Sequence, residues 1–397
     1  MKPFIPALAL ASLLAGCATG PQLAPEPLAR ADAAVQHFIT AGQMPGAVLW
    51  IEQGSARHHK AFGNRLAGAS EPVTEDTLFD AASLTKPVVT ATLVQILRER
   101  GLLDMAAPVS RYLPDCTNVA EVTLRQLLTH TSGLASGLPA SDPFKQGPEP
   151  FDVAMPQAER EARIGHAIER ACAQKVVAEP GRQFRYSDLN FILLGEILAR
   201  VSGRPLQALA QTEIFEPLGM THSGYLPHEK TSIAPTNKPT EHWARGAVHD
   251  PTARRMGGVA GHAGLFTTSA DLARFARMLL NDGVSDSGRR MLSHESILLL
   301  ETPQSPPGVP DLRSLGWDLA TAYSRPRGTL YPKGESFGHT GFTGCAFWLD
   351  PGSRSFFILL ANRVNMPQTS TGTNTLPLYT ELGTLAAEAA GLKPAAP

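Results

Sequence analysis

The sequence predicts an α+β fold in which one antiparallel sheet is built from both ends of the chain. Residues 46–64 (GAVLWIEQGSARHHKAFGN) form two strand-like runs around a turn at 53–55. Residues 344–362 (GCAFWLDPGSRSFFILLAN) repeat this pattern around a turn at 350–353. Between the two hairpins, helical patterns dominate. We therefore expect a sheet flanked by helices, with a mostly helical region inserted at roughly 105–255 and a cleft where the two meet.

Six segments have the length and periodicity of helices. They are residues 85–100, 122–130, 158–173, 189–201, 205–214 and 270–281. In the first segment, the run from Val88 to Leu97 has no polar stripe, which predicts a helix that is buried rather than amphipathic. Loops rich in proline and glycine are expected around 133–156 and 225–258.

The composition is that of an ordinary globular protein. Of the 397 residues, 43% are hydrophobic and 18% are charged, which argues against a disordered chain. Lys and Arg number 35 against 36 Asp and Glu, for a net charge of -1. Because no basic cluster appears, nucleic acid is not expected as a partner.

The N-terminus has the features of a secretory signal over residues 1–16, and its apolar run is too short to span a bilayer. Residues 14–17 (LAGC) resemble a bacterial lipobox, which implies that Cys17 carries a lipid anchor in the periplasm. In bacterial lipoproteins, an Asp directly after the lipidated cysteine would indicate retention in the inner membrane. Residue 18 is an alanine, which favours the outer membrane. The alternative is a simple signal peptide with a chance cysteine. We expect a proline-rich tether at 17–30, a single domain at 31–392 and a tail at 393–397.

Three cysteines remain after Cys17, namely Cys116, Cys172 and Cys345. At most one disulfide can form among them, and a pair between Cys116 and Cys172 is compatible with the sequence but not required by it. Neither C-x-x-C nor H-E-x-x-H occurs, so no metal and no other cofactor is expected.

The first candidate for chemistry is the only S-x-x-K in the chain, Ser83 to Lys86. A serine at a helix N-terminus lies near free backbone N–H groups, which favour an oxyanion. Burial of the lysine would lower its pKa, so that it could accept a proton from the serine. The alternative is that Ser83 is an N-cap and Lys86 extends to solvent.

Two further elements follow along the chain. The first, Tyr186-Ser187-Asp188, precedes an apolar run that we expect to be a helix. One interpretation is that Ser187 or Asp188 caps that helix. The other is that Tyr186 points into the cleft and shuttles protons, with its ionisation favoured by the nearby Lys86. His339-Thr340-Gly341 opens a strong strand, and Gly341 would let a substrate approach closely. The alternative for this element is a tight turn before a core strand.

These elements, in this order, resemble the serine β-lactamase and penicillin-binding protein family. The most similar branch is the class C-like one, which includes D-Ala-D-Ala carboxypeptidases, D-aminopeptidases and esterases. The segments LTKPVVTATLVQILRERG, VTLRQLLTHTSGL and GGVAGHAGLFTTSADLARF are also similar to that family, and the resemblance covers about residues 31–392. It implies a β-lactamase/transpeptidase-like fold.

The resemblance also implies roles for individual residues. Ser83 would be the acylated nucleophile, Lys86 its base partner and Tyr186 the second proton-transfer residue. The backbone N–H groups of Ser83 and Phe342 would form the oxyanion hole. The residues expected to bind substrate are Asp188, His339, Thr340, Gly341 and His262. For His262, and for the nearby His249 and Asp250, loop hydrogen bonds are the alternative.

Two residues depart from the family pattern. Asp188 stands where an asparagine is usual, and an ionised carboxylate cannot donate a hydrogen bond. His339 stands where a lysine is usual. We expect His339 to bind a substrate carboxylate only when protonated, so that KM would rise between about pH 6 and 8.

The sequence therefore predicts a serine hydrolase that forms an acyl-enzyme on Ser83. Its substrates would be D-amino-acid peptides of cell-wall origin, esters or β-lactams. The alternative is a lipid-anchored penicillin-binding or scaffold protein with little turnover. Because Ser83, Lys86 and Tyr186 are all present, catalysis is favoured. The expected partner is a small molecule or peptide, and the oligomeric state is not fixed.

Overall fold

A seven-stranded antiparallel sheet forms the centre of the molecule. The computed structural model describes residues 22–146, 154–227, 232–237, 245–367 and 373–394. The strand order is β2-β1-β9-β8-β7-β6-β5, and every neighbouring pair is antiparallel. The strands are β1 (Gly46–Gln53), β2 (Ala56–Gly63), β5 (Leu312–Arg313), β6 (Asp318–Ala320), β7 (Phe337–Gly341), β8 (Cys345–Asp350) and β9 (Ser355–Ala361). The N-terminal strand β1 pairs with the C-terminal strand β9, which confirms the predicted sheet.

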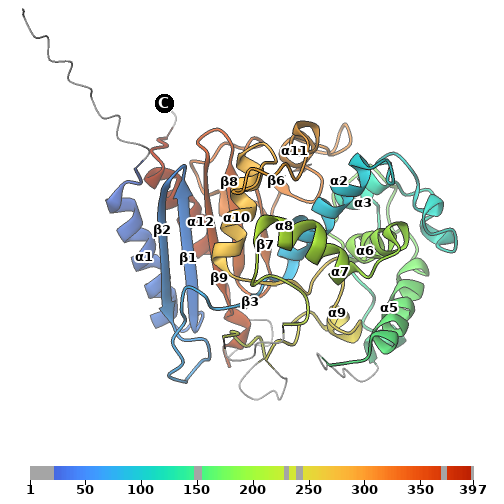
Figure 1. Cartoon of the computed structure of the whole chain (residues 1–397), viewed down its shortest axis with the longest axis horizontal. Coiled ribbons are helices and arrows are strands. Elements are labelled where there is room, and N and C mark those ends of the chain that lie inside the picture. Colours follow the sequence, from blue (N-terminus) through green and yellow to red (C-terminus); the bar gives the residue numbers. More distant parts are fainter. Residues whose placement is uncertain (1–21, 147–153, 228–231, 238–244, 368–372, 395–397) are drawn as a thin grey trace, which may run out of the picture.

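Side chains of the central strands alternate between two cores, as the two-residue period of a strand requires. Along β1, Leu49 and Ile51 belong to one core and Val48 and Trp50 to the other. Helices α1 (Pro25–Thr40) and α12 (Leu376–Ala389) cover the first face, and the helical region with α10 (Ser269–Leu280) covers the second (Figure 1). The sheet is therefore the middle layer of three.

The N-terminal boundary of the domain differs from the expected one. Helix α1 begins at Pro25, so residues 25–30 belong to the fold and not to the predicted tether. Arg30 lies 3.0 Å from Glu388 of α12, and the side chain of Pro27 is buried. Proline is well tolerated in the first turn of a helix, so a proline-rich composition did not exclude one here.

Each of the six predicted helices has a counterpart in the structure. The remaining α-helices are α2 (Thr92–Glu99), α3 (Leu124–Leu128), α4 (Pro143–Gln146), α5 (Gln157–Cys172), α6 (Asp188–Ser202), α7 (Leu206–Ala210), α8 (Glu216–Leu218), α9 (Pro251–Arg255) and α11 (His294–Glu301). The predicted helix at 85–100 is a π-helix (Lys86–Ala91) continued by α2, and it is buried as expected through Leu97. A small sheet of β3 (Phe79–Asp80) and β4 (Phe266–Thr267) leads into it.

Cys116 and Cys172 form a disulfide that closes a 56-residue separation, while Cys345 is a buried free thiol. Among the described residues, no helix is long and apolar enough to cross a membrane. The predicted signal peptide and Cys17 lie outside these residues.

Candidate active site

Ser83 lies in a short 3-10 helix (Ala82–Leu84) that connects β3 to the π-helix. The preceding residue, Ala82, has a φ of 47°, in the left-handed region that costs energy for a non-glycine residue. The buried carboxylate of Asp80 holds this turn, because its Oδ1 accepts from the Ala82 N–H at 2.8 Å and its Oδ2 from the His249 N–H at 2.7 Å. Burial raises the pKa of Asp80 to about 6.

Lys86 begins the π-helix, and its side chain is completely buried. π-helical turns occur frequently at functional sites. The Nζ atom lies 3.0 Å from Ser83 Oγ, 2.9 Å from the His262 carbonyl oxygen and 2.8 Å from Asp188 Oδ1. The three acceptors use all the hydrogens of an ammonium group. Lys86 is thus fixed against Ser83 and does not extend to solvent.

The charge state of Lys86 differs from the expectation. Burial does act to lower its pKa, but the carboxylate of Asp188, together with Tyr186, more than offsets burial and leaves the pKa raised. The resting lysine is therefore an ammonium ion at neutral pH. A free neutral amine beside the serine, as predicted from burial alone, is not the resting state.

Tyr186 lies in the loop just before α6, and the Nζ atom of Lys86 faces its ring at 5.1 Å from the ring centroid. Burial raises its pKa, and the nearby Lys86 offsets this only in part, so the group is a neutral phenol. The expected lowering of the Tyr186 pKa by Lys86 is therefore outweighed by the effect of burial. A neutral phenol in this position can donate a proton.

The sequence did not reveal how Tyr186 is supported. The buried ring of His130 lies beneath it, with centroids 4.5 Å apart, and Nδ1 of His130 accepts from the Ser187 N–H at 3.1 Å. Burial, together with Arg313 and Lys86, lowers the pKa of His130 well below its ordinary value, so this ring is neutral. An isolated histidine in a turn-like sequence gave no signal for this role.

Strand β7 forms the opposite wall of the site. A Cβ on Gly341 would lie 2.5 Å from the Ala81 carbonyl oxygen, so a glycine is needed for β7 to pass this close to the turn of Ser83. After the strand, the Phe342 carbonyl accepts from Nε of Arg363 at 2.8 Å, which fixes the backbone of this turn.

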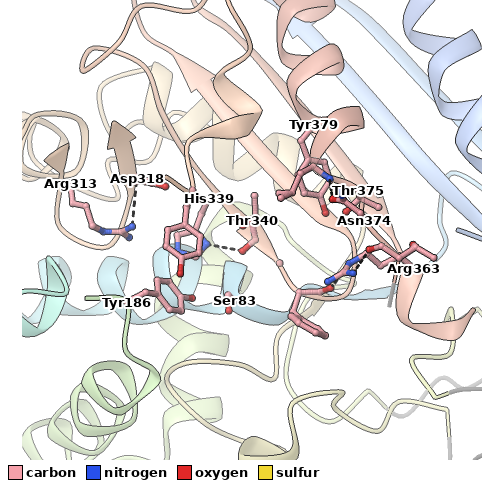
Figure 2. A pocket seen from close by; sticks show the side chains of 15 residues that line it. Ser83, Tyr186, Arg313, Asp318, His339, Thr340, Arg363, Asn374, Thr375 and Tyr379 are labelled. Carbon is pink, nitrogen blue, oxygen red and sulfur yellow. Dashed lines mark hydrogen bonds and ion pairs between the residues drawn. The ribbon is translucent and has the colours of Figure 1, made fainter. Parts of the chain in front are cut away.

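Ser83, Tyr186 and β7 line a cavity of about 430 Å³, large enough for a small ligand. Figure 2 shows Ser83 between Tyr186 and Thr340, with Arg313 and Asp318 beyond His339. The far end carries Arg363, Asn374, Thr375 and Tyr379. Of the predicted site residues, Ser83, Tyr186, His339, Thr340, Gly341 and Phe342 line this cavity.

His339 is nearly buried, and its Nδ1 lies 2.8 Å from the Thr340 carbonyl oxygen. Burial, with the positive charges of Arg313 and Lys86, lowers its pKa well below the ordinary value. The predicted protonation of His339 near neutral pH is therefore wrong. The sequence could not show that two cations, one of them 26 positions away, would face this ring.

Asp188 and His262 lie behind Ser83 and are not among the residues that line the cavity. Asp188 contacts Lys86, while His262 is buried, with Nε2 2.9 Å from Asp250 Oδ1. Hydrogen bonds within the protein, the alternative considered for His262, thus account for its position. Within the described segments, Asp188, Asp250 and His262 are the one group whose donor atoms, all within 4.8 Å, have metal-like spacing. Because the Lys86 ammonium already neutralises Asp188, we assign this group to ion pairing.

Arg313, Asp318 and Tyr323 were missed by the sequence. The guanidinium of Arg313 is fully buried, 3.5 Å from Asp318 Oδ1, and both residues line the cavity. Tyr323, 47% exposed, lies against Tyr186 with ring centroids 5.3 Å apart. All three come from short strands and turns at 312–324, where the sequence has no strong periodicity.

The antiparallel sheet flanked by helices, with a serine bonded to a buried lysine where sheet and helices meet, defines a serine hydrolase. A family model described as Beta-lactamase matches residues 31–379, and the chain belongs to this family.

Comparison with individual proteins agrees with this assignment. A relative from Escherichia coli O157:H7, called "Putative D-alanyl-D-alanine carboxypeptidase", is 28% identical over an alignment 378 residues long. The alignment covers 86% of this chain and 83% of the relative. Among solved structures, EstCE1, "a hydrolase with promiscuous acyltransferase activity", has a TM-score of 0.71 at 19% identity, with 91% of this chain and 99% of that one covered. A class C β-lactamase from Rhodobacter sphaeroides has a TM-score of 0.64 at 21% identity, with 89% and 98% covered. The two structures share the fold.

Proposed function

We propose that the protein hydrolyses its substrate through an acyl-enzyme on Ser83. The observation that carries this proposal is the 3.0 Å contact between Ser83 Oγ and the buried Nζ of Lys86, at the wall of a cavity. A serine needs a proton acceptor within hydrogen-bond reach to act as a nucleophile. Lys86 lies within that reach and can take the serine proton once it has given up one of its own, and Ser83 lies where a substrate carbonyl can approach.

In this proposal, Ser83 Oγ attacks the carbonyl carbon, and the backbone N–H groups of Ser83 and Phe342 stabilise the negative oxygen. The neutral phenol of Tyr186 donates its proton to the leaving group. Water then attacks the acyl-enzyme by the reverse sequence of proton transfers and releases the acid. Thr340 and Gly341 lie beyond the single pairing of β7 with β6 at Gly338, and they present this unpaired side of β7 to an extended substrate, as in strand-addition binding.

For the substrate, we propose D-amino-acid peptides of cell-wall origin, with esters and β-lactams as the alternatives. The name given to the carboxypeptidase-like relatives supports the peptide. The positive charge of Arg363 at one end of the cavity suits a terminal carboxylate, a role that the neutral His339 cannot fill.

The test is a comparison of turnover on three substrates that share the acyl-transfer step: an N-acyl-D-alanyl-D-alanine, a nitrophenyl ester and a chromogenic cephalosporin. We expect steady release of D-alanine by the wild type and none by Ser83→Ala. Stoichiometric acylation without turnover on any of the three would support the alternative, a penicillin-binding or scaffold protein.

We also propose that the protein is exported and held by a lipid on Cys17 in the bacterial periplasm, at the outer membrane. The disulfide between Cys116 and Cys172 supports an oxidising compartment, since such bonds are rare in the cytosol. Incorporation of labelled palmitate into the wild type, and its loss in Cys17→Ser, would test the anchor. Equal labelling of both would refute it.

A further inference from the structure

We propose that Asp188 is the proton acceptor that activates Ser83, with Lys86 acting as a relay between the two. The inference rests on the proposed acyl-enzyme and adds a catalytic role for a carboxylate that stands where the resemblance leads one to expect an asparagine. Its basis is a line of three groups: Ser83 Oγ, Lys86 Nζ at 3.0 Å, and Asp188 Oδ1 2.8 Å from the same nitrogen.

In the resting state, Asp188 is the base to which Lys86 can pass a proton. The His262 carbonyl oxygen accepts a hydrogen bond from Nζ at 2.9 Å but is not a base. Tyr186 also faces Nζ, but it is a neutral phenol until it has protonated the leaving group. Nζ has no contact with water, because the whole side chain is buried. An ammonium held in this way can accept the serine proton only after it has passed one of its own to Asp188.

Asp188 is well placed to remain a carboxylate until it receives that proton. It is the first residue of α6, where the partial positive charge of the helix N-terminus favours an anion. Its backbone N–H donates to the Ser136 carbonyl at 2.8 Å, which fixes the start of the helix relative to the site. The side chain is one-third exposed, whereas Lys86 is enclosed.

The proton transfers balance over one acylation. Lys86 N–H⁺ gives a proton to Asp188 Oδ1 as the lone pair of Nζ takes the proton of Ser83, whose oxygen forms the new bond to the carbonyl carbon. When the bond to the leaving group breaks, Tyr186 protonates that group. The phenolate then takes a proton from Lys86, and Lys86 recovers its own from Asp188, which restores the resting state.

Other ionisable groups surround this line and enter any pH dependence. The electrostatic neighbours of Lys86 and Asp188 on the packed elements are Tyr186, Asp250, His262, His130 and His339. His130 and His339 are neutral, for the reasons given above. The His262 ring is bonded to Asp250, whose pKa is lowered because His262, with a contribution from Lys86, outweighs burial. Asp80, with a pKa of about 6, controls the turn of Ser83.

The experiment combines two measurements on the full chain between pH 5.5 and 9. The first is the ¹³Cε chemical shift of Lys86, assigned by comparison with Lys86→Met, which reports whether the side chain is an ammonium or an amine. The second is the rate of acylation by a fluorescent penicillin. Asp188→Asn is the test variant, because asparagine has nearly the same shape, and Asp188→Glu is the matched variant that keeps a carboxylate.

In the wild type we expect acylation to reach its plateau while the ¹³Cε shift still reports an ammonium. In Asp188→Asn, loss of the carboxylate leaves burial to lower the pKa of Lys86. Acylation should then fall by about a hundredfold at pH 6 and recover as the ¹³Cε signal titrates. Asp188→Glu should retain the wild-type pH profile at a reduced rate.

Wild-type acylation that rises only as Lys86 loses its proton would overturn the relay, because Lys86 would then be the base by itself. The same holds if Asp188→Asn acylates with the wild-type pH profile. Failure of the proposed function gives a different result, namely no serine-dependent acylation at any pH by the penicillin, a nitrophenyl ester or the D-alanyl-D-alanine peptide. The ¹³Cε titration would in that case still show whether Asp188 holds Lys86 as an ammonium.

Discussion

The ring of Tyr186 lies on the ring of His130, with centroids 4.5 Å apart and an angle of 32° between the planes. His130 itself is completely buried and packs against Phe191 of α6. The hydroxyl that faces Ser83 and Lys86 is therefore positioned by a neutral aromatic support and not by a hydrogen bond to a charged residue.

The first prediction concerns this support. His130→Phe keeps the stacking but leaves the Ser187 N–H without its acceptor, so we expect a loss of about 1–3 kcal/mol in the free energy of unfolding with much of the activity retained. His130→Ala removes the stacking as well. We therefore expect a much lower kcat in His130→Ala than in His130→Phe, measured at a temperature at which both variants are folded. Equal kcat values in the two variants would show that the stacking does not position Tyr186.

The second prediction concerns His339, whose pKa lies well below 6.5 because of burial and of the cations Arg313 and Lys86. The ring is also in contact with Tyr186, at 6.0 Å between centroids, and close enough to affect His130. A histidine with a lowered pKa is neutral throughout pH 6–8. KM for a substrate with a free carboxylate should therefore show no step from His339 in this window, and the KM profile of His339→Asn should have the same shape. A KM that rises with pH in the wild type but not in His339→Asn would contradict this account.

The third prediction concerns Asp80 and the stability of the protein. Its pKa of about 6 exceeds the ordinary value of 3.8, so the folded state keeps this proton over a pH range in which the unfolded chain has lost it. The contribution of Asp80 to the free energy of unfolding should accordingly fall by about 2 kcal/mol as the pH rises from 4 to 6. Urea titrations of the wild type and Asp80→Asn would measure it, because the difference between the two isolates this group. If the stability of the wild type rose with pH relative to that of Asp80→Asn, the effect would have the wrong sign.

The fourth prediction uses Gly341. In Gly341→Ala the new methyl group would meet the Ala81 carbonyl oxygen, so β7 must move away from the turn that carries Ser83. We expect acylation to slow by more than tenfold, since small displacements of reacting groups have large effects on rate. Gly137→Ala is the control, because a Cβ there meets nothing within 4 Å. If both variants acylate at the wild-type rate, the close approach of β7 is not needed.

The sequence predicted the two hairpins of the sheet and six helical segments correctly, because these have strong local signals, but it did not predict helices α1, α11 and α12. The two hairpins combine apolar runs with clear turn residues, and the long helices such as α5 and α6 carry a sustained period. Helix α1 was partly assigned to a tether, since prolines at its start resemble a linker. The short strands β5 and β6 were missed because two or three residues cannot show a period.

At the site, the sequence predicted which residues meet but not their charge states. Ser83, Lys86 and Tyr186 do come together, as their order along the chain indicated. The ion pair between Lys86 and Asp188 reverses the pKa shift expected from burial alone. Similarly, Arg313 on strand β5 helps burial to lower the pKa of His339 on β7, so that this ring is neutral where a protonated one was expected. Such long-range electrostatic effects depend on distances that no local pattern encodes.

The central claim is that Ser83 is the nucleophile. The most direct measurement is the intact mass of the protein after incubation with benzylpenicillin, followed by peptide mapping of the adduct. We predict a mass increase of one penicilloyl group located on Ser83 in the wild type, and no increase in Ser83→Ala. The control is Ser55→Ala, an exposed serine in the turn between β1 and β2 and outside the cavity lining, which should still acylate. An adduct that persists in Ser83→Ala, or that maps to another residue, would contradict the account.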